Sequence, residues 1–275
     1  MKKCLIAALL LCLLLGACAR EEGTPTEGKV PTLTDIPSET TGVPGEGLIR
    51  DTQPTERMDP AVGQAGYSLL ENDHSIRNAS GDILVKIQYD QVILDTAQEL
   101  WQPINDRIGA DYRGFLEELA YLQDTPPAQW EQMLQDMGAV YGNFLATCTP
   151  EVTCNGGDIF SIRMTRDWFL GGVYNRDYYG LNFDLATGEE LMLSRLSPLP
   201  EEAFLKQLKE IVSDALADNR DALFEDPAVI LEDFTLADFS YCIEDGELVL
   251  LFPTYTFGPG VLGATEIATG LYPSL

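Results

Sequence analysis

The sequence predicts an α+β domain in which antiparallel β-sheet hairpins pack against three or more amphipathic helices. Long segments carry apolar residues at three- and four-residue spacing, which is the period of a helix packed on one side. Shorter segments alternate apolar and polar residues, which is the period of a half-buried strand. Glycine-rich turn sequences separate these short segments and indicate hairpins.

Three amphipathic helices follow from the helical spacing. The first runs from Trp101 to Leu119, the second follows Pro126-Pro127 and runs from Trp130 to Tyr141, and the third runs from Phe204 to Leu216. A shorter helical piece is expected from Asn219 to Leu231 around Pro227. Each helix presents one apolar stripe, so each is expected to cover part of a sheet.

Strands are predicted on either side of these helices. The expected strands are Ile83–Tyr89, Phe144–Cys148, Ile159–Met164, Val173–Phe183, Glu190–Leu193, Phe239–Ile243 and Leu248–Phe252. Their turns are Asn155-Gly156-Gly157, Gly171-Gly172, Asp184 to Gly188, and Asp245-Gly246. An Asp-Gly pair between two apolar runs is a strong signal for a two-residue hairpin, so the last two strands are expected to pair.

The N-terminus has the features of an export signal. Lys2 and Lys3 precede a 12-residue apolar run, which is too short to span a hydrocarbon core of about 30 Å. The letters Leu15-Gly16-Ala17-Cys18 resemble the lipobox of bacterial lipoproteins, which implies removal of residues 1–17 and a diacylglyceryl group on Cys18. The alternative is an ordinary secretory signal that ends near a cysteine. The expected location is extracytoplasmic, with a lipid anchor in the cell membrane.

A tether is expected between the lipid and the domain. Of the 48 residues from Ala19 to Gly66, 22 are Gly, Pro, Ser or Thr and none is aromatic, so this stretch cannot bury enough apolar surface to fold by itself. We assign residues 18–66 to the tether and residues 67–275 to the domain. About 200 residues suit one domain or two subdomains, about 80–142 and 143–275.

The charge of the chain is strongly negative. Without residues 1–17, the chain has 15 basic and 44 acidic side chains, a formal charge of −29. This excludes nucleic acid as a natural partner, because a phosphate-binding surface needs the opposite sign. A cationic partner would complement this charge. A negative charge also keeps a protein soluble, so it does not by itself indicate a binding site.

No constellation of residues indicates catalysis or a bound cofactor. The single histidine, His74, lies in a polar stretch before the first predicted strand, where it is poorly placed for a Ser-His-Asp or Cys-His triad. The scarcity of histidine and the absence of a Cys-x-x-Cys pair also argue against a usual zinc site. We therefore expect no enzyme activity, no metal and no cofactor.

Three cysteines lie in the domain. Cys148 and Cys154 flank a five-residue segment that contains Pro150, and in an oxidising compartment this spacing predicts a local disulfide. Cys242 is then expected to be a buried free thiol on a strand.

Three blocks of the sequence resemble a known family. Asn182-Phe183-Asp184 with Thr187-Gly188, the double glycine Gly171-Gly172, and the closing Phe252-Pro253 with Tyr255 are similar to the extracytoplasmic domain shared by the anti-sigma factor RsiV and the N-terminal region of the deacetylase PdaC. The likeness spans roughly Asp82 to Ala268. Many relatives follow the double glycine with alanine and histidine, whereas Val173 and Tyr174 stand here.

The resemblance implies a binding domain. RsiV-like proteins bind lysozyme, but they also carry a transmembrane helix and a sigma-binding segment that this sequence does not show. PdaC-like proteins add a deacetylase domain, which is also not seen here. We therefore expect a non-catalytic module that captures lysozyme or another cationic envelope protein.

An alternative function is an accessory protein that holds peptidoglycan or other glycan fragments. It is suggested by the PdaC association and by five aromatic residues near the double glycine, namely Trp168, Phe169, Tyr174, Tyr178 and Tyr179. These aromatics would equally suit a hydrophobic core. A clustered, exposed aromatic surface would favour the glycan function. A hydrolase or deacetylase is the least favoured alternative.

Overall fold

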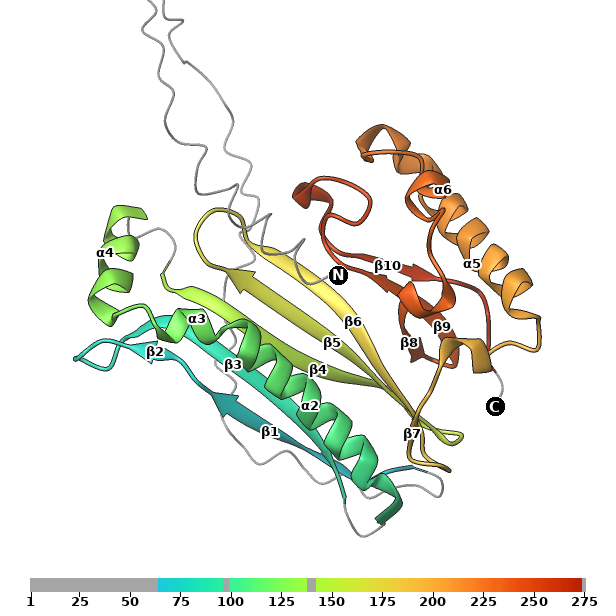
Figure 1. The fold of residues 1–275 in the computed structure, drawn as a ribbon, viewed down its shortest axis with the longest axis horizontal. Coiled ribbons are helices and arrows are strands. Elements are labelled where there is room, and N and C mark those ends of the chain that lie inside the picture. Colours follow the sequence, from blue (N-terminus) through green and yellow to red (C-terminus); the bar gives the residue numbers. More distant parts are fainter. Residues whose placement is uncertain (1–63, 96–98, 138–141, 274–275) are drawn as a thin grey trace, which may run out of the picture. The chain divides into compact units, whose positions relative to one another are not determined.

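The computed structural model describes residues 64–95, 99–137 and 142–273, and it has the predicted α+β class (Figure 1). The described residues belong to one compact unit with a large sheet and a small sheet. The strands of the large sheet are β1 (Tyr67–Asp73), β2 (Ile76–Arg77), β3 (Ile83–Leu94), β4 (Phe144–Gly156), β5 (Ile159–Phe169), β6 (Asn175–Asp184) and β7 (Glu189–Glu190). Those of the small sheet are β8 (Ser240–Glu244), β9 (Glu247–Phe252) and β10 (Thr265–Ala268).

The large sheet is mixed: the predicted antiparallel hairpins are present, and one further pair of strands is parallel. Its order is β1-β3-β4-β5-β6-β7, with β2 also paired to β3. The pair β3 and β4 is parallel, in a register from Val85 opposite Phe144 to Tyr89 opposite Cys148. A parallel pair needs a long crossover rather than a tight turn, and the predicted helices between the two strands supply it.

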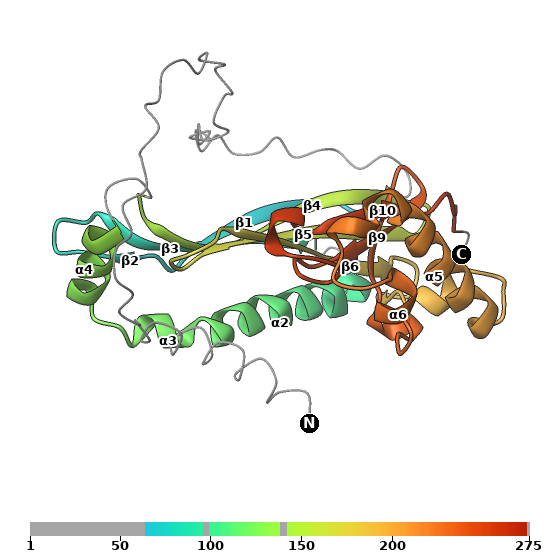
Figure 2. The same ribbon diagram turned by 90° about the horizontal axis from the view of Figure 1, so that it is seen from above.

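Helices of the crossover cover one face of the large sheet (Figure 2). They are the 3₁₀ helix η1 (Glu99–Trp101), α2 (Gln102–Glu118), α3 (Ala120–Gln123) and α4 (Pro127–Met137). The buried residues Ile104, Ile108 and Phe115 of α2 face the sheet, as their spacing predicted. The Asn105 side chain holds the start of α2 against β3, because it accepts from the Leu94 N–H at 2.8 Å and donates to the Leu94 carbonyl at 3.0 Å.

A second hydrophobic core lies between the small sheet and the C-terminal helices. The remaining helices are η2 (Leu193–Arg195), α5 (Glu201–Ala215), η3 (Ala217–Ala222), α6 (Pro227–Ile230), η4 (Leu236–Asp238) and η5 (Gly260–Leu262). Phe204, Leu208 and Val212 of α5 are buried in this core, which confirms the third predicted helix. The β8–β9 hairpin turns at Asp245 and Gly246 with φ of 51° and 81°, the left-handed values that a two-residue hairpin of this type requires.

Several predicted boundaries were wrong. Residues 219–231 are not one helix but two short ones, because Pro227 begins α6 and residues 223–226 separate it from η3. The strand expected at Glu190–Leu193 ends at Glu190, and a 3₁₀ turn follows. The described fold also begins earlier than Tyr67: Ala65 is buried, and its N–H and carbonyl bond the Asn155 side chain at 2.8 and 2.9 Å.

Candidate functional site

The predicted lipid site, Cys18, lies outside the described residues, as do the signal sequence and residues 18–63 of the tether. Within the described part of the chain, no helix has both the length and the apolar character needed to cross a membrane. The candidate functional residues that can be placed are therefore those of the domain.

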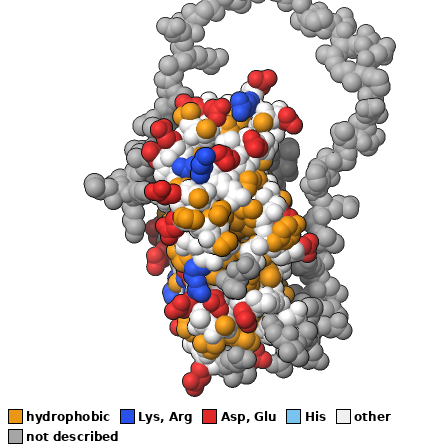
Figure 3. Space-filling view, turned by 90° about the vertical axis from the view of Figure 1, so that its right-hand side faces the viewer, with side chains coloured by type: hydrophobic (Ala, Val, Ile, Leu, Met, Phe, Trp, Pro, Cys, Tyr) orange, Lys and Arg blue, Asp and Glu red, His pale blue; other side chains and the backbone are white. Residues whose placement is uncertain are grey.

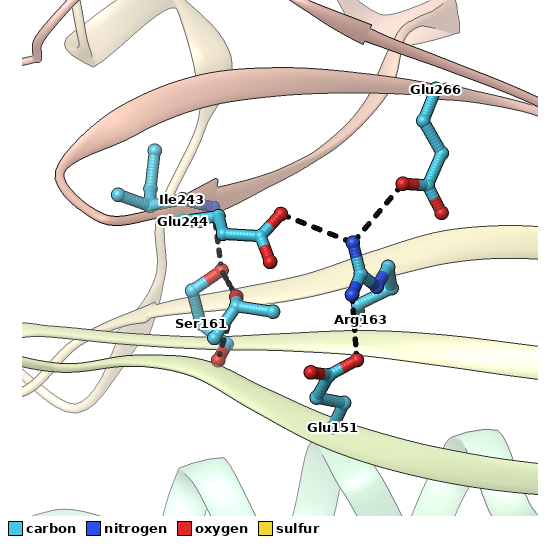
Figure 4. A network of polar contacts seen from close by, with 7 residues as sticks. Glu151, Ser161, Arg163, Ile243, Glu244 and Glu266 are labelled. Atoms are coloured by element: carbon cyan, nitrogen blue, oxygen red, sulfur yellow. Dashed lines mark hydrogen bonds and ion pairs between the residues drawn. The ribbon is translucent and has the colours of Figure 1, made fainter.

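Asn182 and Ser161 join the large sheet to the small one. The Ser161 hydroxyl accepts from the Ile243 N–H at 2.8 Å (Figure 4). It donates to the Asn182 side-chain oxygen at 2.6 Å. The Asn182 amide in turn donates to the Tyr241 carbonyl at 2.7 Å. All these atoms are buried, so the two side chains satisfy backbone groups of β8 that would otherwise need a neighbouring strand.

The rest of the Asn182 block shapes a turn. The Asp184 carboxylate accepts from the N–H groups of Ala186 and Thr187 and pairs with Arg195 at 3.2 Å. Gly188 has φ of 74°, and a Cβ there would lie 2.1 Å from the Leu100 carbonyl oxygen. Phe183 is buried in the larger core. The contacts of Asn182, Phe183, Asp184 and Gly188 are therefore structural.

Replacing Asn182 with alanine is expected to lower the free energy of unfolding by about 2–3 kcal/mol, because the Tyr241 carbonyl and the Ser161 hydroxyl then lose their buried partners. Urea unfolding followed by circular dichroism measures the change. Asn155→Ala, which removes two bonds from a half-buried asparagine of β4 to the Ala65 backbone, provides a comparison. A change below about 0.5 kcal/mol for Asn182→Ala would contradict the structural role.

A charge network on β5 also connects the sheets (Figure 4). The Arg163 guanidinium contacts Glu151 of β4 at 2.6 Å, Glu244 of β8 at 3.1 Å and Glu266 of β10 at 3.1 Å. Its side chain is 14% exposed. Burial alone would lower the pKa of Arg163, but the three carboxylates outweigh it and raise the pKa. The sequence does not reveal this network, because its members are far apart along the chain.

The double glycine and the closing motif lie near each other at one end of β6. Gly171 and Gly172 have φ of 97° and 103° and form the turn between β5 and β6. Thr254, between Pro253 and Tyr255, donates its N–H to the Asp177 carboxylate at 2.7 Å and its hydroxyl to the Arg176 carbonyl at 2.6 Å. These bonds fix the loop after β9 against the start of β6.

Exposed apolar side chains gather on these loops. Val173 is 61% exposed, Tyr174 is 47% exposed, and Tyr255 is 47% exposed. Partial burial and then the neighbouring Asp167 carboxylate raise the pKa of Tyr174 to about 12, so its phenol stays neutral at physiological pH. Phe252, by contrast, is buried, with its ring centroid 4.8 Å from that of Phe257.

The aromatics near the double glycine do not form a clustered exposed surface. Of the five, Tyr174 is exposed, Phe169 is buried, and Trp168, Tyr178 and Tyr179 are half-buried. The Tyr179 hydroxyl donates to the Asp111 carboxylate at 2.6 Å beneath α2, next to an equivalent bond from Tyr89 at 2.7 Å. These five residues therefore do not provide the exposed aromatic platform that would favour glycan binding.

The predicted disulfide between Cys148 and Cys154 is wrong in this structure, where both thiols are free. The segment between them is not a turn but part of the continuous strand β4. Six residues of extended strand span roughly 20 Å, whereas disulfide-linked Cα atoms lie within about 7 Å. Cys242 is a buried free thiol on β8, and burial raises the pKa of both Cys148 and Cys242 to about 12.

His74 is exposed on the loop after β1, where its Nε2 contacts the Tyr112 hydroxyl. The groove beside it, of about 520 Å³, is lined by Asp73, Ser75, Arg77 and Gln123 among others. The Ser75 hydroxyl accepts from the Ile87 N–H at 3.3 Å, so it is engaged with the backbone. Among the residues that the structure describes, no cluster of three or more His, Cys, Asp or Glu is arranged to hold a metal ion.

Together, these features define an α+β domain with a mixed sheet, a small sheet and structural motif residues. No protein-family model and no curated protein matches the chain. Its structure is similar to that of a DUF3298 family protein from Pseudomonas aeruginosa PAO1, with 19% identity and a TM-score of 0.47 over 77% of this chain and 91% of that one. A DUF3298 family member from Bacteroides fragilis NCTC 9343 gives 14% identity and a TM-score of 0.48 over 75% and 90%.

Proposed function

We propose that this protein is a cell-envelope lipoprotein whose domain is a non-catalytic binding module for lysozyme or another cationic envelope protein. The lipobox at Cys18 supports the membrane anchor, and the negative charge of the domain supports a cationic ligand. The RsiV-like motif residues suggested the same ligand class independently of the charge.

The main support for the proposal is that most of the few basic side chains of the domain are paired with carboxylates of the domain itself. From residue 64 onward there are 35 acidic and 11 basic side chains. Eight of the 11 basic side chains form ion pairs with carboxylates of the same chain. They are Arg77, Arg107, Arg163, Arg166, Arg176, Arg195, Lys206 and Arg220.

The excess negative charge is therefore presented at the surface with few cations to offset it. Such a field raises the local concentration and the association rate of a positively charged protein. It repels nucleic acid and anionic lipid headgroups for the same reason. A compact cationic protein in the envelope is the partner that this surface suits best.

The test is binding of the full chain, purified in a nonionic detergent, to immobilised lysozyme at about 20 mM and about 150 mM salt. We expect binding that weakens at the higher salt but persists, because the Debye length of about 8 Å there leaves close contacts effective. Acetylated lysozyme, which keeps the fold but loses its lysine charges, is the matched control. Binding that vanishes at the higher salt would mean charge attraction alone, and no binding at either salt would contradict the proposal.

A further inference from the structure

Resting on the proposed function, we propose that the cationic partner docks on one particular surface of the C-terminal half. We call it the η3 face, and it consists of Asp218, Asp221, Phe224, Glu225, Val261 and Leu262. Three of these residues are acidic and three are apolar. They come from η3 with the segment that follows it, and from the loop that contains η5.

The apolar members are large side chains left in water. Phe224 is 58% exposed, Val261 is 91% exposed and Leu262 is 39% exposed. Single exposed apolar residues are common on soluble proteins, but a group of them held side by side marks an interaction surface.

Backbone contacts hold the two segments of the η3 face together. The Phe224 N–H donates to the Phe257 carbonyl at 2.8 Å. The chain passes so near Gly258 that a Cβ there would lie 2.9 Å from the Ala222 carbonyl oxygen and 2.3 Å from the Leu262 side chain. Phe257 itself is buried in the second core. The apolar residues therefore stand on a fixed base, which lowers the entropy cost of binding.

The charged members lie in a predominantly acidic stretch of the domain. Residues 217–226 contain four carboxylates and one basic residue, Arg220, which pairs with Asp226 at 3.6 Å. Asp218, Asp221 and Glu225 are exposed. A cationic protein can thus bring Lys or Arg side chains next to the apolar residues without meeting an unpaired cation in this stretch.

Figure 3 shows the side of the molecule that carries α5, α6 and the small sheet. Hydrophobic side chains occupy the middle of this side, and acidic side chains lie around them with few basic ones among them. On the η3 face itself, Phe224, Val261 and Leu262 supply exposed apolar side chains and Asp218, Asp221 and Glu225 supply charges, the two kinds of contact that protein interfaces combine. The chemistry fits a protein that presents an apolar group surrounded by lysines and arginines.

The experiment compares two variants with the same change in charge. The test variant is Asp218→Asn, Asp221→Asn, Glu225→Gln, and the control variant is Glu71→Gln, Glu117→Gln, Asp124→Asn on the opposite half of the domain. All six carboxylates are exposed. We expect the test variant of the full chain to bind lysozyme at least roughly tenfold more weakly at about 150 mM salt, and the control variant less than about threefold more weakly.

A second pair of variants tests the apolar members. The test variant combines Phe224→Ser and Val261→Ser, and we expect it to bind lysozyme at least roughly tenfold more weakly even at about 150 mM salt. The control variant combines Leu69→Ser and Leu70→Ser on β1, and we expect it to change binding little. Thermal melting checks that all variants fold. If both charge variants weaken binding equally and the Phe224 and Val261 changes do not matter, the η3 face is wrong while the proposed function stands. If the unmodified chain does not bind lysozyme, both fail.

Discussion

Replacing Gly180 with alanine is expected to destabilise the domain by about 4 kcal/mol or more, which is close to the whole stability of many domains. Gly180 lies on β6, where the small sheet crosses the large one, and a Cβ there would sit 1.6 Å from the Tyr241 carbonyl oxygen. Because that atom belongs to the backbone, it cannot rotate away. The two sheets would have to separate, and the buried bonds of Asn182 and Ser161 would break with them.

Gly156→Ala is the matched control, since Gly156 also lies on a strand of the large sheet but a Cβ there would meet nothing within 4 Å beyond its chain neighbours. We expect that change to alter stability by less than about 1 kcal/mol. Thermal and urea unfolding of both variants measure the difference. Similar stabilities for Gly180→Ala and Gly156→Ala would show that the sheets do not approach each other this closely.

Stability is expected to fall steeply above about pH 9. Burial raises the pKa of Cys148 and Cys242 to about 12 and raises the pKa of Tyr89, Tyr179 and Tyr241 well above the ordinary value. In the unfolded chain the thiols lose their protons near pH 9 and the phenols near pH 10, whereas the folded chain keeps them. The unfolded state then binds fewer protons, so the free energy of unfolding decreases as the pH rises.

Each such group contributes a loss of about 1.4 kcal/mol per pH unit above its unfolded pKa. The two thiols alone would remove roughly 5 kcal/mol by about pH 11, and this stability is fully present below about pH 9. Urea unfolding under reducing conditions from about pH 7 to about pH 11 measures the slope. Burial also raises the pKa of Cys154, so the test replaces all three thiols. In Cys148→Ala with Cys154→Ala and Cys242→Ala, the decline should begin near pH 10 instead of near pH 9, and an unchanged onset would rule out the thiols as its cause.

Local patterns predicted most of the helices and hairpins. The stripe of Ile104, Ile108 and Phe115 marked α2 because a helix against a sheet must bury one side. The Asp245-Gly246 pair located the β8–β9 turn because few residues adopt left-handed backbone angles readily. Such signals lie within a few residues, so they can be read before the chain is folded.

Features that depend on distant residues could not be predicted in this way. β1 is an edge strand with mostly exposed side chains, so it lacks the alternation of a half-buried strand. The parallel pairing of β3 with β4 joins Val85 to Phe144, across the whole helical crossover. The disulfide prediction failed because the spacing of Cys148 and Cys154 around Pro150 suggested that the chain turns between them, whereas pairing with β5 keeps that segment extended.

The candidate site was predicted only in part. The motif around Asn182 was found, but its sequence did not reveal that it supports the small sheet. Nothing in the sequence indicated that Phe224 and Val261 are exposed, because apolar residues are normally expected to lie in the hydrophobic core. Exposure is decided by which segments pack over a residue, and this is a property of the complete fold.

The polar contacts of Ser161 and Asn182 also bear on how the protein avoids self-association. A strand at the border of a sheet normally offers unpaired N–H and carbonyl groups to which another chain can add a strand and start aggregation. Here the outer side of β8 is occupied by side chains of the same molecule, which bond Ile243 and Tyr241 directly. Side chains can occupy a sheet border without extending the sheet, so the Tyr241 carbonyl and the Ile243 N–H are not open to a strand from another chain.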